Sequence, residues 1–453
     1  MNRSASLFTS ILLLTLLTFT PALAKDAEIV FEGSGYANFS VEIRDISTGK
    51  TISNINAEKM LTPASILKLV TSASAITKYG PDHRFSTTAS FSGALNQGIA
   101  VGDITIHASG DPTLYSAHFK ENQTFIADIV ESMKQLGITE VCGDIVIDNR
   151  CMPEAGPLPT WLIEDAFYTY GTGAYPLNYR DNTFILDTDG LTTNPSFSDA
   201  DITYDFIAGE DLKRFHGAYT NQYTLIGDAP LNTRLSLPAS APSAIFAEAL
   251  ENALASAGIR FSNQYCEPAV NPERYILAEY KSPQLSLILK SLMTRSDNMM
   301  AEAVLRMLSP GATLDNALTE QTSILRDSLG VRDKFVRILD GSGLSRKNFV
   351  SAKFISDILR AMAKSPNAKD YTDIFPKAGV DGTVKNFMAK TPLKGRLRLK
   401  SGSMNGVRCY AGYLTDTKGN PRKTIVVMIN DFVIPTSQIN KSIETFLLSE
   451  LNK

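Results

Sequence analysis

Alternating apolar and polar positions predict strands near both ends of the chain. Residues 39–43 alternate in this way before a turn at residues 45–50, so a second short strand is expected to return beside the first. Residues 410–415 and 424–430 show strand patterns on either side of another turn. The apolar stripe in residues 438–451 has a helical period, which predicts a helix that packs on this terminal sheet.

A buried helix is predicted directly after the first strands. Thr62 suits the N-cap, Pro63 suits the first helical position, and Gly80 supplies a stop. Between them, apolar residues recur with a helical period, which favours a helix with one face in the core. These apolar positions are Ile66, Leu67, Leu69, Val70, Ala73 and Ile76.

The pattern changes in the middle of the chain, where short strand patterns such as 103–107 alternate with turn signals. Helical stretches lie between them, for example at 243–257. We interpret residues 88–267 as one inserted domain, with a smaller domain nested near 180–240. The remaining parts of the chain, residues 25–87 and 268–453, then form the core.

The first 24 residues have the features of a secretory signal peptide. Arg3 is the only charge, residues 7–19 are apolar apart from Thr and Ser, and Ala22-Leu23-Ala24 ends the segment with small residues at −3 and −1. An apolar run this short favours cleavage over a membrane anchor. The mature chain is therefore expected to be exported and soluble, without a transmembrane anchor and with at most peripheral membrane association. We expect it in the periplasm, or secreted or associated with the cell wall if there is no outer membrane.

Composition and charge remove several classes of function. The chain carries 44 basic and 47 acidic side chains, a net charge of −3, and shows no basic stripe of the kind that binds nucleic acid. The four histidines lack the spacing of a zinc site, which argues against a zinc hydrolase.

Four cysteines lie beyond the signal segment, and export permits disulfides among them. Three connectivities are open if all four pair. Proximity in sequence favours a local bridge between Cys142 and Cys151. Cys409 sits in an apolar strand pattern, which predicts a buried free thiol.

The buried helix carries the first candidate for chemistry. Ser65 and Lys68 are three residues apart at its start, which places both side chains on one face. A lysine held in a dry site near another cation can accept the proton of a serine hydroxyl. The same S-x-x-K spacing recurs at Ser47 and Lys50, in a turn, so this motif alone is weak.

Two further motifs follow in order along the chain. Ser296-Asp297-Asn298 stands between two helical segments, and Lys400-Ser401-Gly402 ends an alternating stretch as the only K-[ST]-G. Alone, these would be a helix N-cap and a strand end. Together, S-x-x-K, S-x-N and K-[ST]-G form the catalytic set of penicillin-recognising serine enzymes.

The chain resembles the D-alanyl-D-alanine carboxypeptidase/endopeptidase family of low-molecular-mass class C penicillin-binding proteins. Segments beyond the trio that resemble the family are 80–85, 110–114, 299–302, 340–345 and 379–383. The long insertion between Ser65 and Ser296 is typical of the family, whereas the third motif is K-S-G where K-T-G is commoner. The resemblance implies an α/β (α+β) fold: a serine β-lactamase/D,D-peptidase-like core of antiparallel sheet flanked by helices, with a large inserted domain.

The resemblance also implies a mechanism. Ser65 would attack the penultimate D-Ala carbonyl of a peptidoglycan stem peptide, Lys68 would take its proton, and Ser296 would relay one to the departing amine. Lys400 would raise the local positive potential and help to depress the pKa of Lys68.

Substrate binding is implied for the remaining motif residues. Ser401 would bind the terminal carboxylate beside the unobstructed backbone of Gly402, and Asn298 would hydrogen-bond an amide carbonyl. The backbone N–H groups of Ser65 and Ser403 would form the oxyanion hole. β-Lactams would inhibit by forming a long-lived ester on Ser65. The resemblance implies no metal and no organic cofactor.

Three other functions stay open from sequence. A β-lactamase would share the trio but would have to deacylate penicillin quickly, and the long insertion argues against it. An esterase on the same fold is compatible with the motifs. A catalytically silent cell-wall-binding protein would not need Lys68.

Overall fold

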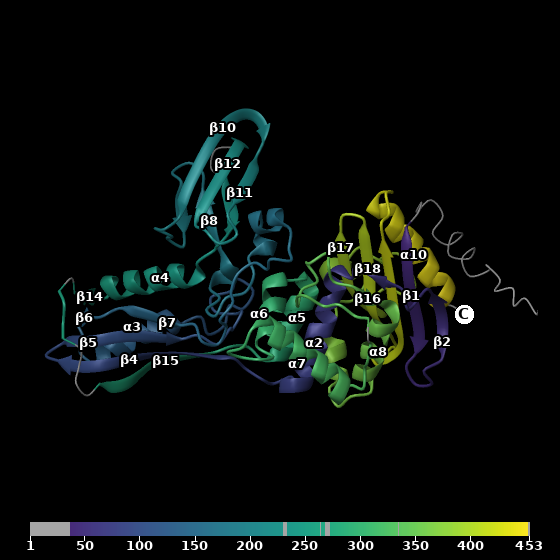
Figure 1. Ribbon diagram of the computed structural model, residues 1–453, viewed down its shortest axis with the longest axis horizontal. Coiled ribbons are helices and arrows are strands. Elements are labelled where there is room, and N and C mark those ends of the chain that lie inside the picture. Colours follow the sequence, from purple (N-terminus) through teal and green to yellow (C-terminus); the bar gives the residue numbers. More distant parts are fainter. Residues whose placement is uncertain (1–36, 230–232, 263, 268–271, 334, 452–453) are drawn as a thin grey trace, which may run out of the picture.

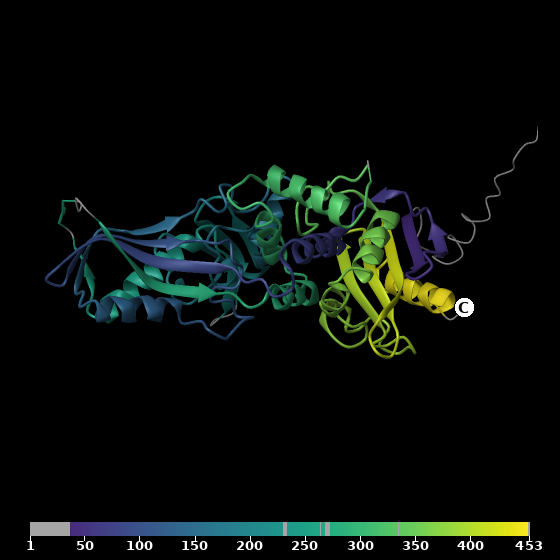
Figure 2. The ribbon, with the colours of Figure 1, turned by 90° about the horizontal axis from the view of Figure 1, so that it is seen from below.

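The structure is a computed structural model that describes residues 37–229, 233–262, 264–267, 272–333 and 335–451 (Figure 1). The predicted signal peptide, residues 1–24, lies outside the described residues. Figures 1 and 2 show an elongated molecule with a sheet at each end and helices between them, and in Figure 1 a further group of strands (residues 183–228, teal) projects upward from the middle. In the described part of the chain, none of the helices has the length and apolar character needed to cross a bilayer.

The core contains a five-stranded antiparallel sheet in the order β17-β18-β19-β1-β2. Its strands come from both ends of the chain, as the sequence predicted: β1 (Asn38–Asp45), β2 (Thr51–Ile55), β17 (Leu397–Met404), β18 (Val407–Thr415) and β19 (Pro421–Asn430). Helix α10 (Thr436–Leu451) packs on one face, while α2 (Lys68–Tyr79) and α8 (Ala352–Ala363) pack on the other. Coverage on both faces explains why residues 424–430 of β19 are all buried. The predicted α/β class is confirmed.

The remaining core elements surround α2. A two-stranded sheet joins β3 (Met60–Leu61) to β16 (Val350–Ser351). The helical elements are η1 (Ala64–Leu67), α5 (Leu285–Arg295), α6 (Asn298–Arg306), α7 (Leu314–Ser323), the π-helical η5 (Ile324–Ser328), α9 (Ala368–Asp373) and η6 (Gly382–Val384). Side chains from α2, α5, α6 and α8 share one hydrophobic cluster.

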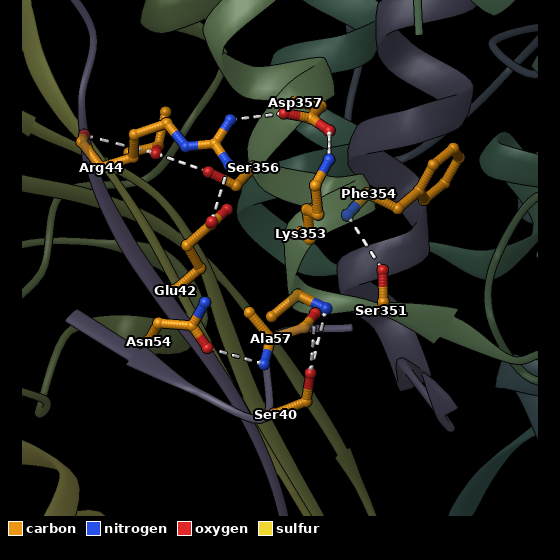
Figure 3. Close-up of polar contacts among 12 residues, drawn as sticks. Ser40, Glu42, Arg44, Asn54, Ala57, Ser351, Lys353, Phe354, Ser356 and Asp357 are labelled. Carbon is orange, nitrogen blue, oxygen red and sulfur yellow. Dashed lines mark hydrogen bonds and ion pairs between the residues drawn. The ribbon is translucent and has the colours of Figure 1, made fainter. Parts of the chain in front are cut away.

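Polar contacts join β1 to α8 at the inner face of the core sheet (Figure 3). Arg44 donates to Glu42 at 2.7 Å and to Asp357 on α8 at 2.5 Å. The Ser40 hydroxyl accepts from the Ala352 N–H at 3.1 Å. The first strand and the helix that covers it are thereby held in one register, since half-buried charged hydrogen bonds are directional.

The inserted domain is built on a six-stranded sheet in the order β14-β6-β5-β4-β15, with β7 paired to β5. Its strands are β4 (Ser86–Asn96), β5 (Ile99–His107), β6 (Glu140–Cys142), β7 (Ile145–Asp148), β14 (Arg260–Phe261) and β15 (Glu273–Lys281). Helices α3 (Phe125–Gln135) and α4 (Pro242–Ser256) bury their apolar faces in the same hydrophobic cluster. Because β15 pairs with β4 from Ser86↔Lys281 onward, this sheet continues past residue 267, where the sequence suggested that the insertion ends.

Two small sheets lie within the region predicted as nested. One has the order β13-β8-β9, with β8 (Thr183–Asp187), β9 (Thr192–Asn194) and β13 (Arg234–Pro238); the other has the order β10-β12-β11, with β10 (Asp201–Asp211), β11 (Lys213–His216) and β12 (Gln222–Asp228). Short 3₁₀ turns precede them: η2 (Ile163–Phe167), η3 (Thr169–Gly171) and η4 (Arg180–Asn182). Phe184 and Tyr223 belong to the same cluster as α3 and α4, so this region shares a hydrophobic core with the larger sheet.

The disulfide joins Cys142 to Cys266, with their Cα atoms 6.1 Å apart, so the predicted bridge between Cys142 and Cys151 is wrong. Cys142 ends β6, whose neighbour β14 precedes Cys266, and strand pairing therefore brings together two residues that are distant in sequence. Cys151 is a free, partly buried thiol. Cys409 is buried and free, as predicted.

Candidate active site

Ser65 and Lys68 lie at the start of the helix that runs through the middle of the core. The Lys68 Nζ donates to the Ser65 Oγ at 3.0 Å. The helix does not begin as predicted: Thr62 donates its hydroxyl to the Arg346 carbonyl instead of capping, and Ser65 sits in the 3₁₀ turn η1. The α-helix begins only at Lys68.

The turn that carries Ser65 is strained and tightly enclosed. Ala64 has φ +48°, a left-handed conformation that is costly for a residue with a Cβ. A Cβ on Gly402 would lie 2.6 Å from the Pro63 carbonyl oxygen and 3.1 Å from the Ser65 nitrogen. A Cβ on Gly343 would lie 2.0 Å from the Ala64 carbonyl oxygen. Glycine at these positions allows two other segments to hold the Ser65 turn in place.

Lys68 is buried and makes two further hydrogen bonds. Its Nζ donates to the Asn298 Oδ1 at 2.6 Å and to the Ser342 carbonyl at 2.7 Å. Burial lowers the pKa of Lys68 to about 8, against the opposing effect of the carboxylates of Asp340, Glu302 and Asp297. Because this pKa lies close to neutral pH, a substantial fraction of the Lys68 amine is uncharged, and Lys68 is suited to take up the Ser65 proton.

Ser296, the next candidate residue, lies in the turn between α5 and α6. Its φ of +63° places it in the left-handed region at the end of α5, while the Asp297 carboxylate accepts from the Met300 N–H at 2.9 Å and caps α6. This geometry turns the Ser296 hydroxyl toward Lys400, whose Nζ donates to the Ser296 Oγ at 2.8 Å. A second serine–lysine pair is thereby formed.

Lys400 is also buried, and its pKa is lowered well below its ordinary value by burial and then by the charge of Lys68. Burial is the main cause of the lowered pKa of Lys68, and the expected contribution of Lys400 to that lowering stays a prediction. Because repulsion between two ammonium groups is mutual, the pair resists holding both protons.

The strand β17 presents the third motif beside Ser65. Ser401 is buried, and its hydroxyl lies 2.7 Å from the Thr383 Oγ1 in η6. Gly402 packs against the Ser65 turn, and Ser403 follows as an exposed residue of the same strand. Thr383 adds a second hydroxyl that the sequence motifs did not identify as part of the site.

Two buried carboxylates, those of Asp340 and Glu302, hold in place the loop whose Ser342 carbonyl contacts Lys68. Asp340 accepts from the Gly343 N–H at 2.8 Å and the Trp161 Nε1 at 3.0 Å, while Glu302 accepts from the Ser342 N–H at 2.8 Å. Burial, followed by the charge of Asp340, raises the pKa of Glu302 to about 7. These contacts fix the Ser342 carbonyl on Lys68. In the sequence, these residues lay in two segments that resemble the family, but no pattern indicated what their side chains would contact.

The inserted domain also reaches the site. The Asn298 Nδ2 donates to the Tyr170 carbonyl at 2.9 Å, and the same side chain accepts from Lys68. Tyr170 belongs to the η3 turn of the insertion, which had no recognisable motif. The position of Asn298 is therefore set from both parts of the molecule.

A Ser-His-Asp group in the inserted domain also went unnoticed in the sequence. The His107 Nε2 lies 3.0 Å from the Ser90 Oγ, and its Nδ1 lies 3.3 Å from the Asp148 carboxylate. The Arg274 guanidinium also lies 3.0 Å from the His107 Nε2. Because arginine only donates hydrogen bonds, the His107 Nε2 accepts from Arg274, and its lone pair is not free to take a proton from Ser90. Ser90 is 2 % exposed within β4. The group therefore lacks an accessible nucleophile.

The chain is similar to a known protein family, to named proteins and to solved structures. The model of the D-Ala-D-Ala carboxypeptidase 3 (S13) family matches residues 25–446. A D-alanyl-D-alanine carboxypeptidase from Actinomadura sp. (strain R39) is 29% identical over 94% of this chain and 86% of its own length. The D-alanyl-D-alanine carboxypeptidase DacB of Haemophilus influenzae is 24% identical over 88% of this chain and 86% of its own. The crystal structure of penicillin binding protein 4 (dacB) from Haemophilus influenzae covers 95% of this chain and 99% of its own, with a TM-score of 0.79 at 23% identity.

Proposed function

The chain belongs to the D-Ala-D-Ala carboxypeptidase 3 (S13) family, and from this premise we propose that it hydrolyses the D-Ala-D-Ala end of peptidoglycan stem peptides through an acyl-enzyme on Ser65. It is a serine-type carboxypeptidase. The observation that carries the assignment of Ser65 is its hydrogen bond to the buried Lys68, at 3.0 Å. Sequence features of residues 1–24 support export to the periplasm.

Acylation begins when the Ser65 Oγ attacks the penultimate D-Ala carbonyl carbon. The neutral Lys68 amine accepts the hydroxyl proton as the new C–O bond forms. The negative charge on the carbonyl oxygen is stabilised by the backbone N–H groups of Ser65 and Ser403. The enclosed turn at Ala64 holds the nucleophile still, which saves orientational entropy at this step.

Breakdown of the tetrahedral intermediate requires a proton on the departing amine. Ser296 donates this proton and is resupplied by Lys400, at 2.8 Å. The C–N bond then breaks and D-alanine leaves, with its carboxylate held by the hydroxyls of Ser401 and Thr383, which lie 2.7 Å apart. Before hydrolysis, the proton that Lys68 took from Ser65 passes through solvent to Lys400, which restores both amines to their starting states. Water then attacks the ester carbonyl, and the neutral Lys68 accepts a proton from this water and returns it to the Ser65 Oγ as the ester C–O bond breaks, which releases the shortened peptide.

Two substrates test this function on the purified protein. A stem pentapeptide ending in D-Ala-D-Ala should lose one D-alanine, and benzylpenicillin should add one drug mass to the intact chain. Rapid appearance of hydrolysed penicillin without an adduct would indicate a β-lactamase. A folded protein that reacts with neither substrate would contradict the enzyme assignment and favour a cell-wall-binding protein.

The rate of acylation should rise with pH. Because burial lowers the pKa of Lys68 to about 8, most of this amine is protonated and inactive as a base at lower pH. The second-order rate constant for benzylpenicillin acylation should therefore increase about tenfold per pH unit well below that pKa and level off above it. Circular dichroism over the same range controls for unfolding. A profile that is flat from pH 6 to 9 would contradict the role of Lys68 as base.

A further inference from the structure

Two adjacent residues of the inserted domain are hydrogen-bonded to a loop of the core, residues 340–345. The Trp161 Nε1 donates to the Asp340 carboxylate at 3.0 Å, and the Ser345 hydroxyl donates to the Thr160 carbonyl at 3.2 Å. Trp161 is only 8% exposed and Asp340 is fully buried, so water does not compete for the first of these contacts. The inserted domain therefore holds both ends of the 340–345 loop.

The 340–345 loop contacts the base of the proposed mechanism at its middle. The Ser342 carbonyl accepts from the Lys68 Nζ at 2.7 Å. The Asp340 carboxylate also accepts from the N–H groups of Gly343 and Ser345, at 2.8 and 2.7 Å. These bonds fold the loop around the carboxylate, so a shift of Asp340 would move the Ser342 carbonyl relative to Lys68.

The charge of Asp340 also acts on Lys68. Burial lowers the pKa of Lys68 to about 8, and the Asp340 carboxylate gives the largest of the effects that raise it, ahead of Glu302 and Asp297. Burial, and then repulsion from Lys68, lowers the pKa of Lys400, and this amine is a cation that acts on Lys68 in return. Asp340 is therefore the acidic group with the strongest effect on the protonation of the base.

The hydrogen bond from Trp161 helps to keep the Asp340 carboxyl charged. Burial raises the pKa of Asp340, and the hydrogen bonds that it accepts, from Ser345 first and then from Trp161, lower it. A donor that faces a buried carboxylate has a larger effect than the same donor at the surface. Loss of the indole N–H would therefore favour the neutral acid.

We propose that Trp161 is a positioning residue for Lys68, through which the inserted domain sets the geometry of the catalytic base. The inference rests on the proposed function, because that function makes Lys68 the base. Trp161 acts through the Asp340 carboxylate and the Ser342 carbonyl, and it takes no part in the transfer of a proton. The insertion thereby contributes to acylation from outside the three motifs.

Loss of the Trp161 N–H should shift the pH profile of acylation to lower pH. A neutral Asp340 withdraws part of the negative charge that favours the ammonium form of Lys68. A displaced 340–345 loop withdraws the Ser342 carbonyl, which accepts from that ammonium. Both changes lower the pKa of Lys68, so the rising limb of the profile should move toward acid. The plateau should fall as well, because the base is held less firmly.

The sequence allows the N–H to be removed with little change of shape. Trp161 is the only tryptophan of the chain, so an analogue supplied to a tryptophan-auxotrophic host replaces this residue alone. Benzothienylalanine has sulfur in place of the indole N–H, while 5-fluorotryptophan keeps the N–H and is the matched control. The measurement is the second-order rate constant for benzylpenicillin acylation between pH 6 and 10. With the sulfur analogue, the midpoint should fall by at least about half a pH unit and the plateau by about tenfold.

Tyr413→Phe distinguishes positioning from a general loss of stability. The Tyr413 hydroxyl is buried and donates to the Leu359 carbonyl at 2.7 Å, so this substitution also removes one buried donor and keeps the ring, but it does so between β18 and α8. It should lower the free energy of unfolding and leave the midpoint of the pH profile unchanged. Trp161→Phe removes the same N–H as the sulfur analogue and replaces it in the test if the sulfur analogue does not fold.

The outcomes separate this inference from the proposed function. A midpoint that stays in place or moves to higher pH in folded protein with the sulfur analogue would overturn the positioning role and leave the carboxypeptidase intact. An equal shift in Tyr413→Phe, or with 5-fluorotryptophan, would also overturn it, because the shift would not depend on the Trp161 N–H. A wild-type protein that neither reacts with penicillin nor releases D-alanine would instead remove the proposed function itself.

Discussion

Ser65→Ala should abolish both D-alanine release and the penicillin adduct. The Ser65 Oγ receives a hydrogen bond from Lys68 at 3.0 Å, and the substitution removes the atom that would form the acyl bond while the backbone of the turn stays enclosed. Loss of a catalytic nucleophile lowers kcat by about 10⁴–10⁶-fold. Intact mass spectrometry after incubation with benzylpenicillin, together with kcat/KM on the pentapeptide, measures the effect.

The chain supplies a matched control in its second S-x-x-K sequence. Ser47 precedes Lys50 with the same spacing but lies in an exposed turn, where its hydroxyl donates to Asp45 at 2.7 Å. Ser47→Ala should keep full acylation. A penicillin adduct that persists in Ser65→Ala would contradict the assignment, and mapping the labelled peptide would then identify the true nucleophile.

Gly343→Ala should damage both stability and acylation. Gly343 has φ +80°, and an added Cβ would lie 2.0 Å from the Ala64 carbonyl oxygen and 3.0 Å from the Leu67 Cβ. The Ser65 turn would have to move, because a backbone atom cannot rotate away as a side chain can. We expect a loss of about 3–4 kcal/mol in the free energy of unfolding and acylation about a hundredfold slower.

Chemical denaturation and the rate of penicillin acylation by the folded fraction measure these two effects. Gly330→Ala is the matched control, since Gly330 has φ +68° but an added Cβ would meet nothing within 4 Å. It should cost only about 1–2 kcal/mol from the left-handed conformation and leave acylation unchanged. Equal behaviour of the two variants would show that close packing on Ala64 does not position the nucleophile.

The sequence predicted best those parts of the fold that depend on local periodicity. The strands at both ends of the chain and the helix over 438–451 appear in the structure close to the expected ranges. Pairing between distant segments leaves no such local signal. The pairing of β15 with β4 and the Cys142–Cys266 disulfide both depend on contacts between segments that are distant in sequence. Proximity in sequence therefore favoured Cys151 as the partner of Cys142, which was wrong.

The same distinction applies to the candidate site. Motif order brought Ser65, Lys68 and Ser296 into one hypothesis, because each motif fixes the spacing of its own side chains. The contact of Lys68 with the Ser342 carbonyl and that of Asn298 with the Tyr170 carbonyl had no sequence signal. Backbone carbonyls can be supplied by any residue type, so amino-acid identity carries no information about them.

The position of β1 in the core sheet has a consequence for the order of folding. On one side β1 pairs with β2, but on the other side Asn38 pairs with Asn430, so the first described strand acquires its second neighbour only when nearly the whole chain has been synthesised. The inserted domain closes its sheet with β15 and can complete its own long-range pairings much earlier. Ser65 can meet β17 only after every strand of that domain has been synthesised. All residues of the inserted domain are therefore made before β17, β18 and β19, and the active site can form only when these last strands are present.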